Sequence, residues 1–176
     1  TGVRVADLLA RAQPSPGADQ VLSASTDGFT ASTPLAVLLD GRDAMVAIAM
    51  DGRPLTPEHG FPARLVTPGL YGYVGATKWL TRLTVTTFAA EQAYWTTRGW
   101  AEQAPVKTAT RIDTPTGRIL AGATVVAGVA WATHRGVSRV QVQVDGGPWQ
   151  DARLGPDVGL DYWRQWYLPW NATSGR

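Results

Sequence analysis

Three basic side chains of different kinds stand close together near the middle of the chain. His59, Arg64 and Lys78 fall in the stretch HGFPARLVTPGLYGYVGATKWL, although the whole chain has only two histidines and two lysines. An arginine offers a planar fork of donors for phosphate oxygens, and a histidine or a lysine adds donors and charge. Glycine-rich loops let backbone N–H groups approach the same anion. This pattern indicates an anion-binding wall that would include Thr77. On spacing alone, ordinary surface residues on strands and turns are the favoured explanation.

Other chemistries find little support in the sequence. His59 and His134 lie far apart without HExxH spacing, which argues against a histidine zinc site. The chain has no cysteine, so disulfides, thiolate metal sites and cysteine nucleophiles are excluded. Neither a GxSxG elbow, a Walker loop nor a GxGxxG loop after a strand occurs. We therefore predict no metal site and no self-contained catalytic residue.

Composition limits the class of protein further. The chain has 176 residues, of which 44% are hydrophobic and 17% charged, so it can bury one sizeable core or two small ones. Its net charge is +2 and its basic residues are scattered, whereas nucleic-acid binding requires a basic stripe. No apolar run approaches the roughly 20 residues that cross a bilayer. We expect this chain to be soluble and to bind no nucleic acid.

The motif must be positioned by helices and strands that alternate irregularly. Helix-like apolar spacing begins at the first residues and continues to Ala12, and a short helix is expected at 34–41, with Pro34 in its first turn. Residues 20–25 and 78–88 are rich in strand formers. The segment 90–100 predicts one or two helical turns closed by a glycine. These elements indicate an α+β unit without a βαβ rhythm.

A change in composition divides the chain. Residues 101–117 are polar and rich in turn formers, which is typical of a domain edge. Beyond them, valines alternate with polar residues at 140–144 and the following DGG favours a hairpin turn. Short strands at this spacing predict a small immunoglobulin-type β-sandwich, truncated because about seven strands are expected for that fold. Four tryptophans are expected to pack inside it: Trp131, Trp149, Trp163 and Trp166.

The order of these motifs resembles a known family. HGFPAR, then KWLTRLTV, then YWTTRGW is similar to the pattern H-G-F/Y-P-x-R … K-W-L … of the sulfite oxidase family of molybdopterin enzymes. GVAWATHRGVSRVQVQVDGGPWQDARL resembles the immunoglobulin-like dimerisation domain of that family. The resemblance implies that residues 1–104 are the C-terminal part of a molybdopterin-binding domain and residues 105–176 the sandwich. It is closest to actinobacterial members, which often carry a membrane-spanning N-terminal region.

The resemblance also implies roles for single residues. His59 and Arg64 match residues that contact the pyranopterin cofactor, largely at its phosphate end, and Thr77 and Lys78 match residues that line it. Asp27, in TDGF, matches an acid that binds the pterin. These are binding residues, and none of them performs the redox step.

Two differences from the family pattern limit what this chain is expected to do. The molybdenum ligand of the family is a cysteine, which this chain lacks. Trp100 stands where sulfite-oxidising members have a tyrosine near the metal, which places sulfite in doubt as the substrate. We expect a C-terminal fragment of a molybdenum-cofactor-dependent oxidoreductase that is inactive and without cofactor by itself.

The expected partners follow from the fragment interpretation. They are the remainder of the same chain, including the upstream half of the cofactor domain and a membrane region, and a second copy in a homodimer. The parent protein is expected to be membrane-associated or extracytoplasmic. The alternative from another class is a tryptophan-rich, immunoglobulin-like binding or association module without catalysis.

Overall fold

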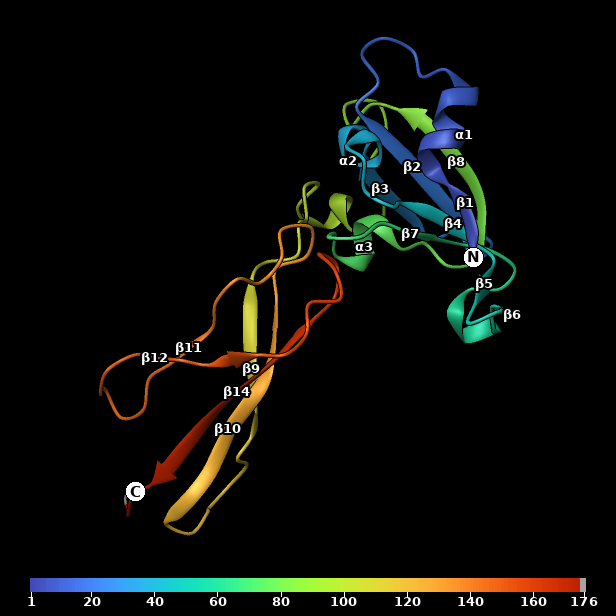
Figure 1. The fold of residues 1–176 in the computed structure, drawn as a ribbon. Coiled ribbons are helices and arrows are strands. Elements are labelled where there is room, and N and C mark those ends of the chain that lie inside the picture. The colour runs from blue at the N-terminus through green and yellow to red at the C-terminus, as the bar shows by residue number, and fades with distance from the viewer. Residues whose placement is uncertain (175–176) are drawn as a thin grey trace. The chain divides into compact units, whose positions relative to one another are not determined.

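A computed structural model describes residues 1–174 and divides the chain into two compact units, Thr1–Pro105 and Val106–Arg176 (Figure 1). We call them unit 1 and unit 2. Both are built mainly from short antiparallel strands, and the longest helix has 8 residues. The expected α+β class is therefore correct only in part, because strands dominate even where the sequence predicts a mixture.

Unit 1 contains two three-stranded antiparallel sheets, with strand orders β1-β4-β7 and β3-β2-β8, and a small hairpin of β5 and β6. Its elements, in chain order, are β1 (Gly2–Arg4), α1 (Val5–Ala12), β2 (Gln20–Ser25), β3 (Thr30–Pro34), α2 (Leu35–Leu39), β4 (Met45–Ala47), β5 (Ala49–Met50), β6 (Arg53–Pro54), the 3-10 turn η1 (Pro57–His59), β7 (Arg64–Val66), α3 (Gly72–Gly75), β8 (Leu80–Thr86) and the 3-10 turn η2 (Thr96–Arg98).

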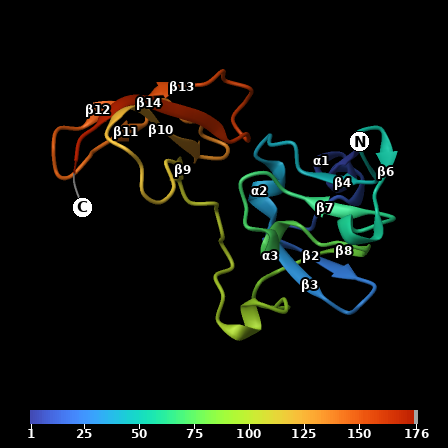
Figure 2. The ribbon, with the colours of Figure 1, turned by 90° about the horizontal axis from the view of Figure 1, so that it is seen from below.

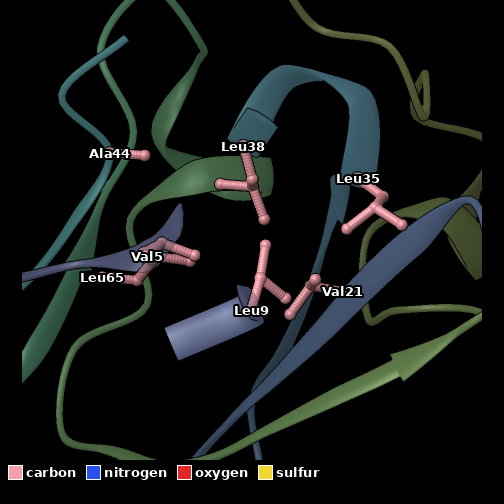
Figure 3. Packing of buried hydrophobic residues seen from close by; sticks show 7 residues of the cluster. All are labelled: Val5, Leu9, Val21, Leu35, Leu38, Ala44 and Leu65. Atoms are coloured by element: carbon pink, nitrogen blue, oxygen red, sulfur yellow. The ribbon is translucent and has the colours of Figure 1, made fainter. Parts of the chain in front are cut away.

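The core of unit 1 lies between its two sheets and two of its helices. Figure 3 shows α1, α2 and residues of both sheets pointing into one apolar cluster. Its members are Val5, Leu9, Val21, Leu35, Leu38, Ala44 and Leu65. Each fully buried aliphatic side chain stabilises the fold by about 1.5–3 kcal/mol. This core fixes the ends of β2 and β7, from which the candidate site is built.

The beginning of the chain differs from the sequence prediction. Residues 2–4 form β1, paired with β4 through Val3 and Val46, and the helix starts only at Val5. Pairing with β4 at the edge of a sheet outweighs the helical spacing of these first residues. The short helix expected at 34–41 is present as α2, with Pro34 directly before it.

The β3-β2-β8 sheet has two different faces. Val21, on one face, packs into the apolar core. Side chains alternate along a strand and residues paired across antiparallel strands share a face. Gln20, Leu22 and Ser32 therefore lie together on the opposite face, because Leu22 is paired with Ser32. All three are buried. We call this the polar face of the sheet.

Unit 2 is one four-stranded antiparallel sheet, order β13-β14-β10-β9, together with a hairpin of β11 and β12 (Figure 2). Its strands are β9 (Ala109–Thr114), β10 (Gly122–Trp131), β11 (Gln141–Val142), β12 (Gln150–Asp151), β13 (Arg153–Leu154) and β14 (Arg164–Ala172). Its core includes Val126 and Trp166 of the sheet and Val140 and Val142 of the hairpin segment. The alternation read from the sequence at 140–144 thus identifies the apolar face correctly.

The tryptophans of unit 2 do not all pack inside it. Trp166 is 2% exposed, as expected, but Trp149 is 61% and Trp163 54% exposed, so the prediction for these two was wrong. Trp163 stacks on Trp131 with ring centres 4.7 Å apart. Indole rings are wide enough to cover a sheet face from outside, and burial inside a core is only one way to use them.

A search for membrane spans found no helix among the described residues with the length and apolar character to cross a bilayer.

Candidate functional site

The basic residues singled out in the sequence meet around the η1 turn. Arg64 Nη1 donates to the carbonyl of His59 at 3.3 Å, and Lys78 Nζ donates to the carbonyl of Glu58 at 3.1 Å. The indole N–H of Trp79 donates to the carbonyl of Pro57 at 2.8 Å. The carbonyl end of a helical turn carries partial negative charge, which favours these cations. The two cations therefore hold the turn in place.

His59 is exposed at the end of this turn. Its Nδ1 lies 2.9 Å from the hydroxyl of Thr56. This hydrogen bond fixes the ring, and Nε2 takes no part in it. Gly60 follows with φ of 98°, and a Cβ there would lie 2.8 Å from the Cβ of Lys78. Only glycine fits this close approach in this conformation without displacing the lysine.

Arg64 keeps one donor unused. Its Nε is buried and has no hydrogen-bond partner. A buried N–H without an acceptor is costly, by about 1–3 kcal/mol. Arg64 and Lys78 thus both bind carbonyls of the turn that carries His59, and anion binding by the three side chains stays a prediction.

Lys78 also reaches a cavity on the other side. The cavity has a volume of about 240 Å³ and is open to solvent. It is lined by Gly72 and Tyr73 of α3, by Ala76 and by residues of two other segments. These are Ser25, Asp27 and Phe29 in one segment and Lys78 and Trp79 in the other. We call it the Lys78 cavity. Neither His59 nor Arg64 lines it.

Asp27 places a carboxylate at the rim of the Lys78 cavity. The backbone N–H of Phe29 donates to it at 3.0 Å, and this hydrogen bond is the main reason why the pKa of Asp27 lies below its usual range. Asp27 is therefore an acceptor at neutral pH. The hydroxyl of Ser25 lies beside this carboxylate and is a second cause of its lowered pKa. Acceptor, hydroxyl and ammonium thus face one small space with aromatic walls.

Thr77 takes a different position from the one the resemblance implies. It is fully buried, and its hydroxyl hydrogen bonds with that of Ser23 at 2.7 Å. Nearby, the hydroxyl of Thr33 donates to the carbonyl of Val74. These side chains support α3 and the loop before Lys78 from below. Contact of Thr77 with a cofactor stays a prediction, and its visible contribution is to hold the loop.

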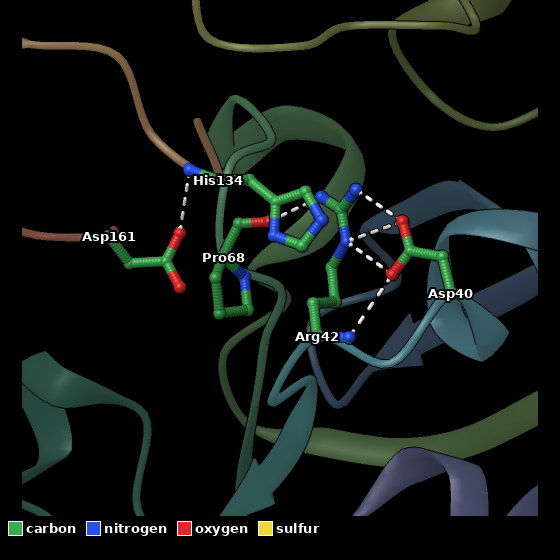
Figure 4. Close-up of polar contacts among 5 residues, drawn as sticks. All are labelled: Asp40, Arg42, Pro68, His134 and Asp161. Carbon is green, nitrogen blue, oxygen red and sulfur yellow. Dashed lines mark hydrogen bonds and ion pairs between the residues drawn. The ribbon is translucent and has the colours of Figure 1, made fainter. Parts of the chain in front are cut away.

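Hydrogen bonds of an arginine side chain also hold the loop that leads into α3. Arg42 forms an ion pair with Asp40 and donates to the carbonyl of Pro68 at 2.6 Å (Figure 4). Its side chain is 9% exposed, so the contact is largely protected from water. Sequence reasoning missed this arginine because DGRD reads as an ordinary turn. Within unit 2, Figure 4 also shows the N–H of His134 donating to Asp161, and His134 is exposed.

Aromatic rings connect the two sides of the Lys78 cavity. Trp100 lies against Tyr73 with ring centres 4.8 Å apart, and against Trp95 at 4.6 Å. Trp95 contacts Tyr94 at 5.1 Å, and Tyr94 contacts Phe29 at 5.8 Å. Phe29 and Tyr73 are cavity residues. Trp100, 49% exposed, is therefore beside the cavity rather than in its wall.

The donors and acceptors of this region fit a planar heterocycle with a charged tail. Asp27 can accept from ring N–H groups, Lys78 can donate to a ring oxygen, and the Ser25 hydroxyl beside Asp27 can donate or accept. Arg64 and His59 offer donors of the kind that bind phosphate. Sequence reasoning found the charged members of this set. It missed Ser25 and Tyr73, for which the only signal was proximity to Asp27 and Lys78 in the sequence.

Comparison with known proteins places this geometry in context. The family model described as "Oxidoreductase molybdopterin binding domain" matches residues 1–95. The mitochondrial sulfite oxidase of Mus musculus is 31% identical over 168 residues, which is 80% of this chain and 30% of that protein. The NADPH nitrate reductase of Fusarium oxysporum is 38% identical over 100 residues, covering 53% of this chain and 11% of that protein.

A solved structure is similar in fold. The sulfane dehydrogenase SoxCD from Paracoccus pantotrophus superimposes with a TM-score of 0.76 at 26% identity, covering 97% of this chain and 47% of that one. Human mitochondrial sulfite oxidase is 30% identical over 176 residues, again with only 32% of its own length covered. The chain thus spans about a third of the length of the sulfite oxidases it matches.

Proposed function

Because the chain belongs to the sulfite oxidase family of oxidoreductase molybdopterin binding domains, we propose that it forms one wall of a molybdenum cofactor site within a longer oxidoreductase. The observation that carries this proposal is the Lys78 cavity, where Asp27, the Ser25 hydroxyl and Lys78 face one space of about 240 Å³. Small-molecule sites are concave and mostly apolar, with a few polar groups that fix orientation.

In this proposal each residue has a separate binding role. Asp27, kept ionised by the Phe29 N–H, accepts from N–H groups at the pterin end, and Lys78 donates to an oxygen of the same ligand. Arg64 offers its unused Nε, together with His59, to the phosphate end. Thr77 acts indirectly by holding the loop that carries Lys78. When bound, the cofactor supplies the redox chemistry, and these residues supply orientation and charge.

The proposal is tested in the full-length parent protein by two substitutions in the cavity. We expect Lys78→Met and Asp27→Asn each to lower the pterin content of the purified protein about tenfold or more, because hydrogen bonds to charged groups contribute roughly 1.5–3 kcal/mol. Pterin is measured by fluorescence after oxidative release, and molybdenum by elemental analysis. Arg82→Met, an exposed arginine on β8 outside the cavity, is the matched control. Wild-type pterin content in both cavity variants would contradict the proposal.

This chain by itself is proposed to lack activity. It has no cysteine to bind molybdenum through a thiolate, and it covers about 30% of the sulfite oxidases it matches. We expect elemental analysis of the purified chain to find molybdenum far below one atom per chain. For the parent we propose a membrane-associated or extracytoplasmic location, as in the actinobacterial members that the sequence resembles. Fractionation of cells that express the full-length protein tests this.

Unit 2 supports a second proposal, that it is an immunoglobulin-like association module. Val125 is 40% and Tyr167 41% exposed, and because Val125 pairs with Pro169 while Tyr167 pairs with Ala127, both lie on the same face of the sheet. Exposed apolar patches are typical of protein interaction sites. Sedimentation equilibrium of the chain should detect a homodimer that Val125→Ser together with Tyr167→Ser weakens. A wild-type chain that sediments as a monomer at all concentrations would contradict this second proposal.

A further inference from the structure

The segment after β8 is fastened to the polar face of the β3-β2-β8 sheet. Residues 87–101 contain little regular structure apart from the η2 turn. We call them the strap. Gln20 and Thr30 lie on the same face of the sheet by register, and both hold strap residues. The strap therefore runs along this face and covers Leu22 and Ser32, which are 7% and 1% exposed.

Gln20 is the central anchor of the strap. Its side-chain nitrogen donates to the carbonyl of Thr87 at 2.8 Å and to the carbonyl of Glu91 at 2.7 Å. The residue is 0% exposed, and its own amide oxygen has no hydrogen-bond partner. A buried, partly unsatisfied amide is unfavourable for stability alone, and such violations of local rules concentrate at functional positions.

The far end of the strap stands at the rim of the Lys78 cavity. The N–H of Tyr94 donates to the hydroxyl of Thr30 at 3.1 Å, next to the cavity residue Phe29. The hydroxyl of Tyr73, another cavity residue, donates to the carbonyl of Ala101 at 3.0 Å. Between these two points the strap carries Trp95 and Trp100, which link the rings of Phe29 and Tyr73.

We propose that Gln20 is a positioning residue that holds the strap in place and thereby fixes Phe29 and Tyr73, the two aromatic walls of the Lys78 cavity that the strap contacts. The amide lies at the opposite end of β2 from Ser25, so it touches nothing that binds in the cavity. It acts through the strap, whose rings contact two cavity walls. The inference goes beyond the proposed function and rests on it only for what the cavity holds.

Two lysines allow a direct test without any cofactor. The chain has only Lys78, in the cavity, and Lys107, in unit 2, so acylation of Lys107 is an internal reference in the same molecule. We expect Gln20→Met to raise the acylation rate of Lys78 relative to Lys107 severalfold. Hydrogen exchange of backbone amides within 87–101 should accelerate about tenfold, because two buried hydrogen bonds are lost.

Gln92→Met is the matched control, since it makes the same chemical change at an exposed residue of the strap itself. It should leave both measurements unchanged. Suppose that Gln20→Met speeds hydrogen exchange within 87–101 but leaves the acylation rate of Lys78 unchanged. Gln20 would then hold the strap without affecting the cavity, and the proposal would be overturned. No change in either measurement would overturn it as well.

A second variant separates strap release from failure to fold. Gln20→Glu keeps the shape but places a carboxyl against the two carbonyl oxygens, so burial and repulsion raise the pKa of the introduced group. Below that pKa the introduced carboxyl is protonated and can donate, so the strap stays bound to the sheet. As pH rises through this pKa the carboxyl loses its proton and the strap is released. The ratio of Lys78 to Lys107 acylation should rise with pH more steeply than in the wild type. Parallel curves would overturn the proposal.

Acylation and hydrogen exchange need no cofactor, so they can support the role of Gln20 even if the pterin experiment contradicts the cofactor site. The pterin experiment can likewise support the cofactor site if Gln20 proves to have no such role. The two proposals therefore stand or fall separately.

Discussion

Units 1 and 2 are stabilised by different kinds of buried side chain. Among residues 1–174, the polar residues that are buried all belong to unit 1: Gln20, Ser23, Ser25, Ser32, Thr33, Thr67 and Thr77. The buried residues of unit 2 are apolar, and ion pairs such as Arg139–Asp151 lie on its surface. Buried hydroxyls and amides add little net stability but direct loops precisely through hydrogen bonds. The unit with the polar interior is also the one that builds a cavity.

The tightly packed sheet of unit 2 is expected to be sensitive to added side-chain atoms. A Cβ on Gly128 would overlap the carbonyl oxygen of Arg111, because β9 crosses close to β10 there. We expect Gly128→Ala to destabilise unit 2 by at least about 3 kcal/mol, since the backbone of a strand must move. Urea unfolding followed by hydrogen exchange should show early exposure of β10 and β14 with β2 and β8 unaffected.

The control for this prediction is Gly72→Ala in unit 1, where the nearest atom to the added Cβ is 3.6 Å away. It should change stability by less than about 1 kcal/mol. Equal effects of the two substitutions would mean that close strand packing does not distinguish the units.

Unit 2 does contain one polar anchor, and it should behave like those of unit 1. Arg164 donates to the carbonyls of Val137 and Gly155 and pairs with Asp157. Its side chain is 21% exposed. Arg164→Met should cost about 2 kcal/mol, because the carbonyls lose charged donors, and should increase hydrogen exchange in 155–163. Arg118→Met, at an exposed position, should have no effect.

The hydroxyl pair below α3 should contribute less. Thr77→Val removes the bond to Ser23, whose hydroxyl keeps its bond to the carbonyl of Ala31. We expect a loss of about 1 kcal/mol. A double-mutant cycle with Ser23→Ala, followed by urea unfolding, should give a coupling of similar size. A coupling near zero would mean that the two hydroxyls do not support the loop together.

The smallest effect is expected for a surface ion pair of unit 2. Arg139 donates to Asp151 at 2.7 Å and holds the pKa of that carboxyl below its ordinary value of 3.8. A lowered folded-state pKa stabilises the fold above the unfolded-state value and is lost as pH falls through the folded-state value. Asp151→Asn should therefore remove a small part of the acid sensitivity below pH 3.8. Added salt should produce a similar loss in the wild type, because both partners are exposed.

How far the sequence predicts this molecule depends on the distance between interacting residues. The strand at Leu80–Thr86 and the apolar face of Val140 and Val142 follow from local alternation, and both are present. Gln20 could not be assigned, because its partners lie 67 and 71 residues further along the chain. Its local context, a polar residue at the start of a strand, predicts an exposed position.

The candidate site was predictable in its charges and less so in its shape. His59, Arg64 and Lys78 were found as a group because their residue types are rare in this chain or suited to anions. That two of these cations would grip carbonyl oxygens of a turn was not predictable, because the sequence does not reveal backbone direction. The exposed positions of Trp149 and Trp163 were missed for a related reason, since hydrophobicity alone does not distinguish the two faces of a sheet.

The contact between Gly60 and Lys78 ties two distant positions into one unit for protein engineering. Any side chain at position 60 meets the stem of the lysine before it meets anything else. Because the nearest of these atoms are the Cβ and Cα of Lys78, which every residue except glycine has, a library randomised at position 60 should return larger residues only where the backbone that carries the lysine has moved.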